Sequence, residues 1–174
     1  MGYSRIQIIL HWAVAVLVLA MAAGGLAYSF DLADKSILRG HQSAGQILIV
    51  LLALRIAIRL KRGAPPAPAE HAVWERRLAS TVHGLLYLCL IVFVASGYVS
   101  ASALSDNLLL FPVDLGFARS DTGEIILEVH YRLKWVLLAL FALHFAGAMK
   151  HAFVDRDATL SRMSFARKSD EPQA

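Results

Sequence analysis

Cysteine, charge and proline are all scarce in this chain of 174 residues. Its single cysteine, Cys89, excludes an internal disulfide, a paired-cysteine zinc site and an iron–sulfur cluster held by four cysteines. Charged residues make up only 17% of the chain, and hydrophobic residues make up 57%. That hydrophobic share exceeds what a soluble domain normally carries. The composition therefore favours a membrane protein.

The hydrophobic residues gather in four segments, each close to the roughly 20 residues that a membrane-spanning helix needs. They run from about Leu10 to Phe30, Gly40 to Leu60, Leu78 to Ser105 and Glu128 to Ala152. Arg5 precedes the first segment and small residues end it, so a cleaved signal peptide is the alternative there. Three further spans favour a retained helix. We predict an all-α membrane protein, an up-and-down four-helix bundle with one domain over residues 1–174 and a tail over 153–174.

The connections between these segments differ in charge. The connection from Arg59 to Arg77 and the tail are rich in arginine and lysine, and a proline-rich stretch stiffens the middle of that connection. The connection from Asp106 to Val129 carries five acidic residues against Arg119 alone. Because positive residues stay on the cytoplasmic side, we predict that both termini are cytoplasmic. The formal net charge of +4 reflects this topology, so we expect the lipid bilayer, and no nucleic acid, as a partner.

The histidines fall on two levels of the predicted bundle. His130 and His144 lie fourteen residues apart on the fourth segment, a step of about 21 Å that returns to within roughly 40° of the same helix face. The same step applied to the other segments sorts the remaining candidates. The outer level collects His41, His130, Gly25 and Gly97, and the inner level collects His11, His83, His144 and Arg55.

Polar imidazoles are rare within a membrane, and histidine is a common axial ligand of haem iron. We therefore interpret the two levels as two haem sites, held without covalent attachment because no Cys-x-x-Cys-His motif occurs. The glycines would make room for a flat macrocycle, and Arg55 would neutralise propionates. Each feature also has an alternative. The histidines would form only hydrogen bonds, Arg55 would extend to the lipid headgroups, and the glycines would permit close helix packing. A zinc site is the less favoured alternative to haem. Depth alone does not decide whether His11 or His83 is the second haem ligand at the inner level.

Several motifs resemble those of the bacterial cytochrome b561 family, which is related to the cytochrome b subunits of hydrogenases and formate dehydrogenases. Their order and spacing cover nearly the whole chain. They are Tyr3–Trp12, Gly40–Gly45, His83–Tyr87, the His130 and His144 pair, and Asp157–Met163. The resemblance implies two b-type haems, a quinone partner and the bacterial inner membrane. It also implies that His11 and His144 ligate the inner haem and that His41 and His130 ligate the outer one. His83 would then lie beside the inner haem or its propionates.

Stand-alone members of that family are linked to electron transfer from superoxide to ubiquinone. Arg132 and Lys134 flank His130 at the outer rim and would attract an anion there, although anchoring in the headgroups explains them equally well. His151, seven residues beyond His144, is the candidate quinone contact and proton donor. Its alternative is a solvated interfacial residue.

Two other functions compete with that one. In the first, the chain is the membrane anchor that relays electrons from a soluble dehydrogenase or hydrogenase subunit to quinone. In the second, it is a small non-redox membrane protein such as a transporter. The apolar stretch Leu108–Val113 is interpreted as a lid over the outer haem or as a partner-binding patch.

Overall fold

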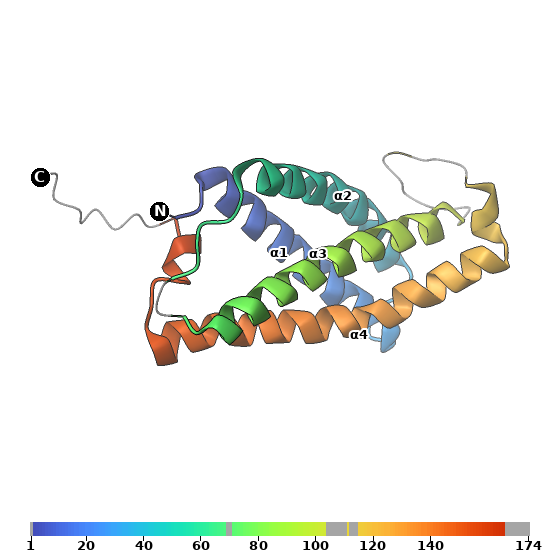
Figure 1. The fold of residues 1–174 in the computed structure, drawn as a ribbon. Coiled ribbons are helices and arrows are strands. Elements are labelled where there is room, and N and C mark those ends of the chain that lie inside the picture. Colours follow the sequence, from blue (N-terminus) through green and yellow to red (C-terminus); the bar gives the residue numbers. More distant parts are fainter. Residues whose placement is uncertain (1, 69–70, 104–110, 112–114, 166–174) are drawn as a thin grey trace, which may run out of the picture.

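The computed structural model describes residues 2–68, 71–103, 111 and 115–165, and Figure 1 shows the fold. Four long helices make up most of it, and all four are long and apolar enough to cross a membrane. This confirms the predicted all-α membrane protein with four spanning helices. The helices are α1 (Arg5–Ser29), α2 (Ser36–Arg62), α3 (Val73–Ser102) and α4 (Asp121–Met149).

All four helices begin several residues earlier than hydropathy predicts. α1 starts behind a capping box in which Ser4 accepts from the backbone N–H of Gln7. At the start of α3, Glu75 accepts from the N–H of Ala72 at 2.9 Å. α4 begins at Asp121, seven residues before the predicted Glu128, because acidic residues in a first turn stabilise a helix N-terminus. The predicted connection from Arg59 to Arg77 accordingly shrinks to residues 63–72.

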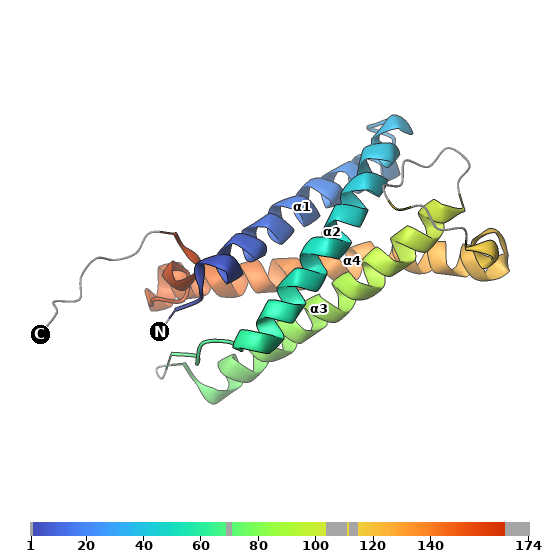
Figure 2. The ribbon, with the colours of Figure 1, turned by 90° about the horizontal axis from the view of Figure 1, so that it is seen from above.

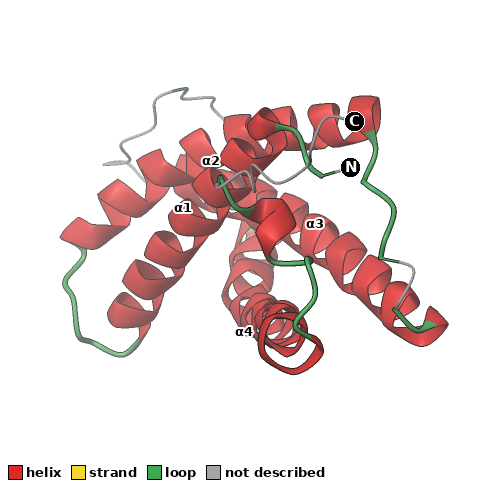
Figure 3. Cartoon of the chain, turned by 90° about the vertical axis from the view of Figure 1, so that its left-hand side faces the viewer, coloured by secondary structure: helices red, strands yellow, loops and turns green. Residues whose placement is uncertain are grey.

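We call the end where α1 begins and α4 finishes the inner end, and the opposite end the outer end. The described residues before α1 and after α4, up to Phe165, lie at the inner end (Figure 1), and Figure 3 views the molecule from that side. Beyond α4 the chain continues as a π-helical turn, η2 (Lys150–Asp155), and a short 3-10 helix, η3 (Ser161–Met163). A further 3-10 helix, η1 (Gly116–Arg119), precedes α4 at the outer end.

Packing joins α1 to α2, α2 to α3 and α3 to α4 (Figure 2). Within the described residues, the backbones of α1 and α4, and those of α2 and α4, approach each other at most marginally. No large side chain among these residues is completely buried, and many large hydrophobic side chains face outward. Protein interiors are normally close-packed, so this thin core with outward-facing hydrophobic side chains is typical of a bundle that meets lipid on its outside.

Two segments outside the four long helices form hydrogen bonds to other parts of the fold. At the inner end, Trp12 donates its indole N–H to the carbonyl of Met163 at 2.9 Å, and Arg162 donates to the carbonyl of Pro66 at 2.8 Å. The predicted lid Leu108–Val113 lies outside the described residues except for Phe111. That residue bonds through its backbone to the side chain of Gln46 and accepts from the hydroxyl of Tyr98.

Candidate functional site

At the outer level, His41 of α2 and His130 of α4 face each other. Their ring centroids are 6.3 Å apart and the ring planes are 84° apart. His130 Nδ1 lies 3.0 Å from the carbonyl oxygen of Phe93, an acceptor that fixes the ring proton on Nδ1. That bond leaves the lone pair of Nε2 available to a metal, the arrangement in which ligating histidines are normally held. Ser96 lies 3.2 Å from the same nitrogen.

The two glycines of this level have different surroundings. A Cβ on Gly97 would lie 2.8 Å from Cε1 of His130, whereas a Cβ on Gly25 would lie 3.5 Å from Cε1 of His41. The first distance is a clash and the second is an ordinary contact. Gly97 therefore makes room for the His130 ring itself, and Gly25 permits close approach without requiring it.

His41 carries a polar atom without a partner. Among the described residues, its Nδ1 is the buried side-chain nitrogen that lacks a hydrogen bond. The backbone of Met21 lies beside the ring, but Nδ1 has no hydrogen-bond partner. Ligation through Nε2 normally comes with an acceptor for the Nδ1 proton, so the His41 ring is oriented less firmly than that of His130.

At the inner level, His144 of α4 has two histidine neighbours. Its ring centroid is 6.3 Å from that of His11 on α1, with the planes 67° apart. The centroid of His83 on α3 is closer, at 5.1 Å, with the planes 68° apart. The structure thus brings together all three inner histidines that the sequence places at this depth.

These separations test whether a haem iron fits. A metal bonded to an imidazole nitrogen at about 2.0–2.1 Å lies about 3 Å from the ring centroid, so two axial rings place their centroids about 6 Å apart. The His41–His130 and His11–His144 pairs both match this value. The His83–His144 pair is about 1 Å too close. The residues therefore fit bis-histidine ligation at both levels, with His11 favoured over His83.

Arg55 contacts His11 rather than standing free. Its Nη2 lies 3.0 Å from His11 Nδ1, and its guanidinium lies 5.7 Å from the ring centroid of Tyr87. Arginine is always a donor, so His11 Nδ1 accepts and a neutral ring carries its proton on Nε2. Ligation through Nε2 needs the opposite tautomer. Arg55 must therefore release His11 before that nitrogen can bind iron.

The two basic candidates at the outer rim are not equivalent. Arg132 is 81% exposed and pairs with Glu128 at 2.6 Å. Lys134 donates to Ser29 at 2.9 Å and lines a pocket of about 590 Å³ that also holds Asp31 and Asp34. Hydrogen bonds from Ser36 lower the pKa of Asp34, which keeps that carboxylate charged. The outer rim is therefore mixed in charge, and Lys134 is its less neutralised cation.

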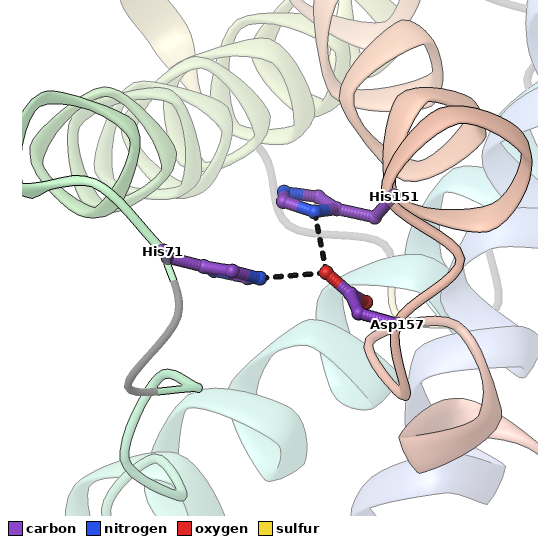
Figure 4. A group of neighbouring side chains, drawn as sticks. All are labelled: His71, His151 and Asp157. Atoms are coloured by element: carbon purple, nitrogen blue, oxygen red, sulfur yellow. Dashed lines mark hydrogen bonds and ion pairs between the residues drawn. The ribbon is translucent and has the colours of Figure 1, made fainter.

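The inner end holds a cluster that sequence reasoning missed. Figure 4 shows Asp157 between His71 and His151. Its Oδ2 lies 2.8 Å from His71 Nε2 and 2.8 Å from His151 Nδ1. The two rings stack with centroids 4.2 Å apart and planes 19° apart. We call these three residues the His71–Asp157–His151 cluster. The sequence analysis named His151 as a candidate quinone contact and placed Asp157 in the closing motif, but it did not link these residues to each other or to His71.

Local backbone geometry builds this cluster. His151 lies in the π-helical turn η2, a conformation frequent at functional sites. Arg156 ends that turn with φ 54°, a left-handed conformation that reverses the chain and returns Asp157 to His151. Burial alone would raise the pKa of Asp157, but hydrogen bonds from Thr159, His71 and His151 lower it well below its usual value. The carboxylate is therefore charged.

A pocket of about 750 Å³ opens beside the cluster. It is lined by the proline-rich connection on one side and by the segment after α4 on the other. Its lining residues include Pro66, Pro68, His71, Asp155 and Asp157. A pocket with both polar and apolar lining, beside the hydrogen-bonded His71, is suited to a small polar-headed substrate.

Comparison with known proteins decides the family. The profile of prokaryotic cytochrome b561 matches residues 2–166. The chain belongs to the prokaryotic cytochrome b561 family. It is 29% identical to cytochrome b561 homolog 2 of Escherichia coli (strain K12), over 97% of this chain and 94% of that protein. It is 28% identical to a probable superoxide oxidase CybB of Yersinia pestis, over 92% of this chain and 94% of that protein.

Membership in this family confirms the resemblance inferred from the motifs. The chain is a multi-pass membrane protein of an electron-transfer family that binds b-type haem. A non-redox transporter, the third interpretation of the sequence, does not fit that family. The comparisons leave the donor, the acceptor and the number of haems to be argued from the residues.

Proposed function

We propose that this cytochrome carries electrons across the bacterial inner membrane through two b-type haems, from superoxide at the outer end to ubiquinone at the inner end. The proposal rests on an arrangement of side chains that occurs twice in the bundle. Two histidine pairs with the same 6.3 Å centroid separation lie one above the other, each sharing a histidine of α4. We assign His41 and His130 to the outer haem, and His11 and His144 to the inner haem.

The chain prepares these two positions with its own residues. Phe93 orients His130, and Gly97 gives its ring room. Arg55 lies at the inner level, within reach of the acidic groups that a haem would bring there. Haem bound at the two levels supplies one-electron redox chemistry. The spacing of His130 and His144 along α4, about 21 Å, sets the distance over which the protein must move the electron.

At the inner end we propose His151 as the quinone contact. His151 Nδ1 is bonded to Asp157, which leaves Nε2 to face a quinone oxygen. Reduction of a quinone to a quinol takes up two protons with two electrons, and a histidine paired with a carboxylate is suited to deliver protons. Seven residues, about 10 Å along a helix, separate His151 from His144. The adjacent pocket is lined by His71 and Asp157, the two partners of His151 in the cluster, and would hold the headgroup beside it.

Support for superoxide as the donor comes from one relative and one residue. The relative is the probable superoxide oxidase of Yersinia pestis. The residue is Lys134, whose ammonium lines the outer pocket and stands near Tyr131 and Trp135. Arg132 contributes less, because Glu128 neutralises it.

A reduced-minus-oxidised spectrum with haem quantitation tests the core of the proposal. We expect two haems per chain in the wild type and one in each of the single variants His41→Ala, His130→Ala, His11→Ala and His144→Ala. The matched control is His83→Ala, which should keep both. A colourless preparation, or one haem in the wild type, would refute the two-haem assignment.

A kinetic assay then separates the donor alternatives. The purified chain alone should be reduced by superoxide and reoxidised by ubiquinone. If superoxide fails and only a co-purifying soluble subunit reduces the haems, the chain is the membrane anchor of a larger dehydrogenase or hydrogenase. His151→Ala should slow reoxidation by quinone without loss of haem.

A further inference from the structure

We propose that the His71–Asp157–His151 cluster is a binding site for a divalent transition metal, with Zn²⁺ as the best-matched ion. Two parts of the chain that are far apart in the sequence supply its ligands. His71 comes from the connection before α3, whereas His151 lies in η2 and Asp157 follows it by six residues (Figure 4). The metal would join these segments at the inner end.

The three donor atoms lie close together. His71 Nε2, His151 Nδ1 and a carboxylate oxygen of Asp157 lie within 4.8 Å of one another. Ligands bound to zinc at about 2.0–2.1 Å in a tetrahedral site lie about 3.3 Å apart. The two nitrogen-to-oxygen distances are 2.8 Å, so each needs to lengthen by only about half an ångström. The two rings stack with their planes 19° apart, and a metal lies in the plane of each imidazole that binds it, so both rings must turn about their side-chain torsions to bind one ion.

The chemistry of the donors matches the same ion. Two imidazole nitrogens and one carboxylate form the set that zinc uses in open sites, in which water takes the fourth position. The three side chains are only 11%, 15% and 17% exposed, so they are partly withdrawn from competing water. The carboxylate is charged, and Asp155 adds a second negative group 2.9 Å from His151 Nδ1. Thr159 Oγ1, 3.5 Å from His71 Nε2, offers a further oxygen.

Metal binding would also regulate the site. This part of the inference rests on the proposed function, because it takes His151 as the quinone contact. A metal on Nδ1 of His151 displaces Asp157 as its hydrogen-bond acceptor and occupies the wall of the adjacent pocket. We therefore expect Zn²⁺ to inhibit quinone reduction, with the inhibition depending on His71, a residue that the haem sites do not use.

Equilibrium dialysis with elemental analysis tests the metal site directly. The full-length, haem-loaded protein is used after removal of any histidine tag, with Zn²⁺ as the probe. We expect one tightly bound Zn²⁺ per chain, and affinity at least about tenfold lower in His71→Ala and in Asp157→Asn. Glu128→Gln, a carboxylate change at the outer end, is the matched control and should bind like the wild type. Unchanged haem spectra in all variants exclude misfolding as the cause.

Zinc X-ray absorption gives a second readout that misfolding does not mimic. We expect two imidazole nitrogens and at least one light oxygen ligand in the wild type, and one imidazole in His71→Ala. The absence of stoichiometric binding, or binding that His71→Ala leaves unchanged, would overturn the proposal.

Quinone kinetics separate metal binding at the cluster from its proposed effect on quinone reduction. If Zn²⁺ binds in dialysis but does not slow quinone reduction, the regulatory part is wrong. If the protein fails to reduce quinone without metal, the proposed function fails and dialysis alone still decides the metal site.

Discussion

Substituting Gly97 by alanine is expected to weaken binding of the outer haem while leaving the inner one unaffected. The added Cβ would lie 2.8 Å from Cε1 and 3.1 Å from Nδ1 of His130. Carbon atoms in ordinary contact lie about 3.5–4.0 Å apart, so the ring must retreat by about 0.7 Å or more. That movement strains or breaks the 3.0 Å bond between Nδ1 and the carbonyl of Phe93, which orients the ring for ligation.

The size of the effect follows from the cost of overpacking. Inserting a methyl group into a filled site costs about 1–3 kcal/mol, which corresponds to a roughly 5- to 150-fold loss of affinity at the outer site. The free protein can avoid this cost by turning His130 away, so the loss falls on the haem-bound arrangement. Helix propensity acts in the opposite direction, because alanine favours a helix over glycine by about 1 kcal/mol. Unfolding of α3 is therefore not expected.

Gly25→Ala supplies the matched control. It makes the same substitution at the same level, but its Cβ would meet His41 Cε1 at 3.5 Å, an ordinary contact. Haem titration followed by reduced-minus-oxidised spectra measures both variants. We expect Gly97→Ala to bind the second haem weakly and Gly25→Ala to bind both haems like the wild type. Equal haem binding by the two variants would refute the steric role assigned to Gly97.

Three further predictions follow from the site. His83→Ala should keep the inner haem and His11→Ala should lose it, as measured by haem quantitation; the reverse result would move the ligand to α3. Because the pKa of Asp157 is lowered from its ordinary value of 3.8, this carboxylate stabilises the fold above about pH 4 and loses that effect as the pH falls further. The difference in melting temperature between wild type and Asp157→Asn should therefore shrink in acid, and a constant difference would contradict this. Lys134→Gln should slow reduction by superoxide and weaken its dependence on salt, whereas Arg132→Gln should change little; equal effects would remove the distinction between the paired and the less neutralised cation.

The number and order of the helices could be predicted because hydropathy in a membrane protein is a strong signal. The residues at which the helices begin could not be predicted, since hydropathy assigns the polar residues at helix N-termini to loops. Asp121 and Glu124 were assigned to the connection on account of their charge, yet that charge stabilises the first turn of α4. Hydropathy reports the part of a helix that meets lipid, and capping decides where the helix begins.

Part of the candidate site could likewise be predicted from the sequence, and part could not. Helical spacing alone predicted the depths of His41, His130 and His144. It could not separate His11 from His83, because both lie at the same depth and differ only in their distance from His144. The cluster containing His71 was out of reach for another reason. Its three residues come from an irregular connection, a π-helical turn and a reversed segment, and no periodic pattern links such elements.

The two haem levels are prepared to different extents, and the difference has an electrostatic cause. At the outer level, His130 already holds the tautomer that ligation needs, since a backbone carbonyl accepts its Nδ1 proton. At the inner level, Arg55 donates to Nδ1 of His11 and imposes the opposite tautomer. A guanidinium within an apolar span needs an acceptor at all times. The propionates of a haem bound at this level would offer charged acceptors that a neutral imidazole cannot match, so they would draw Arg55 away from His11 and leave that ring free to change tautomer.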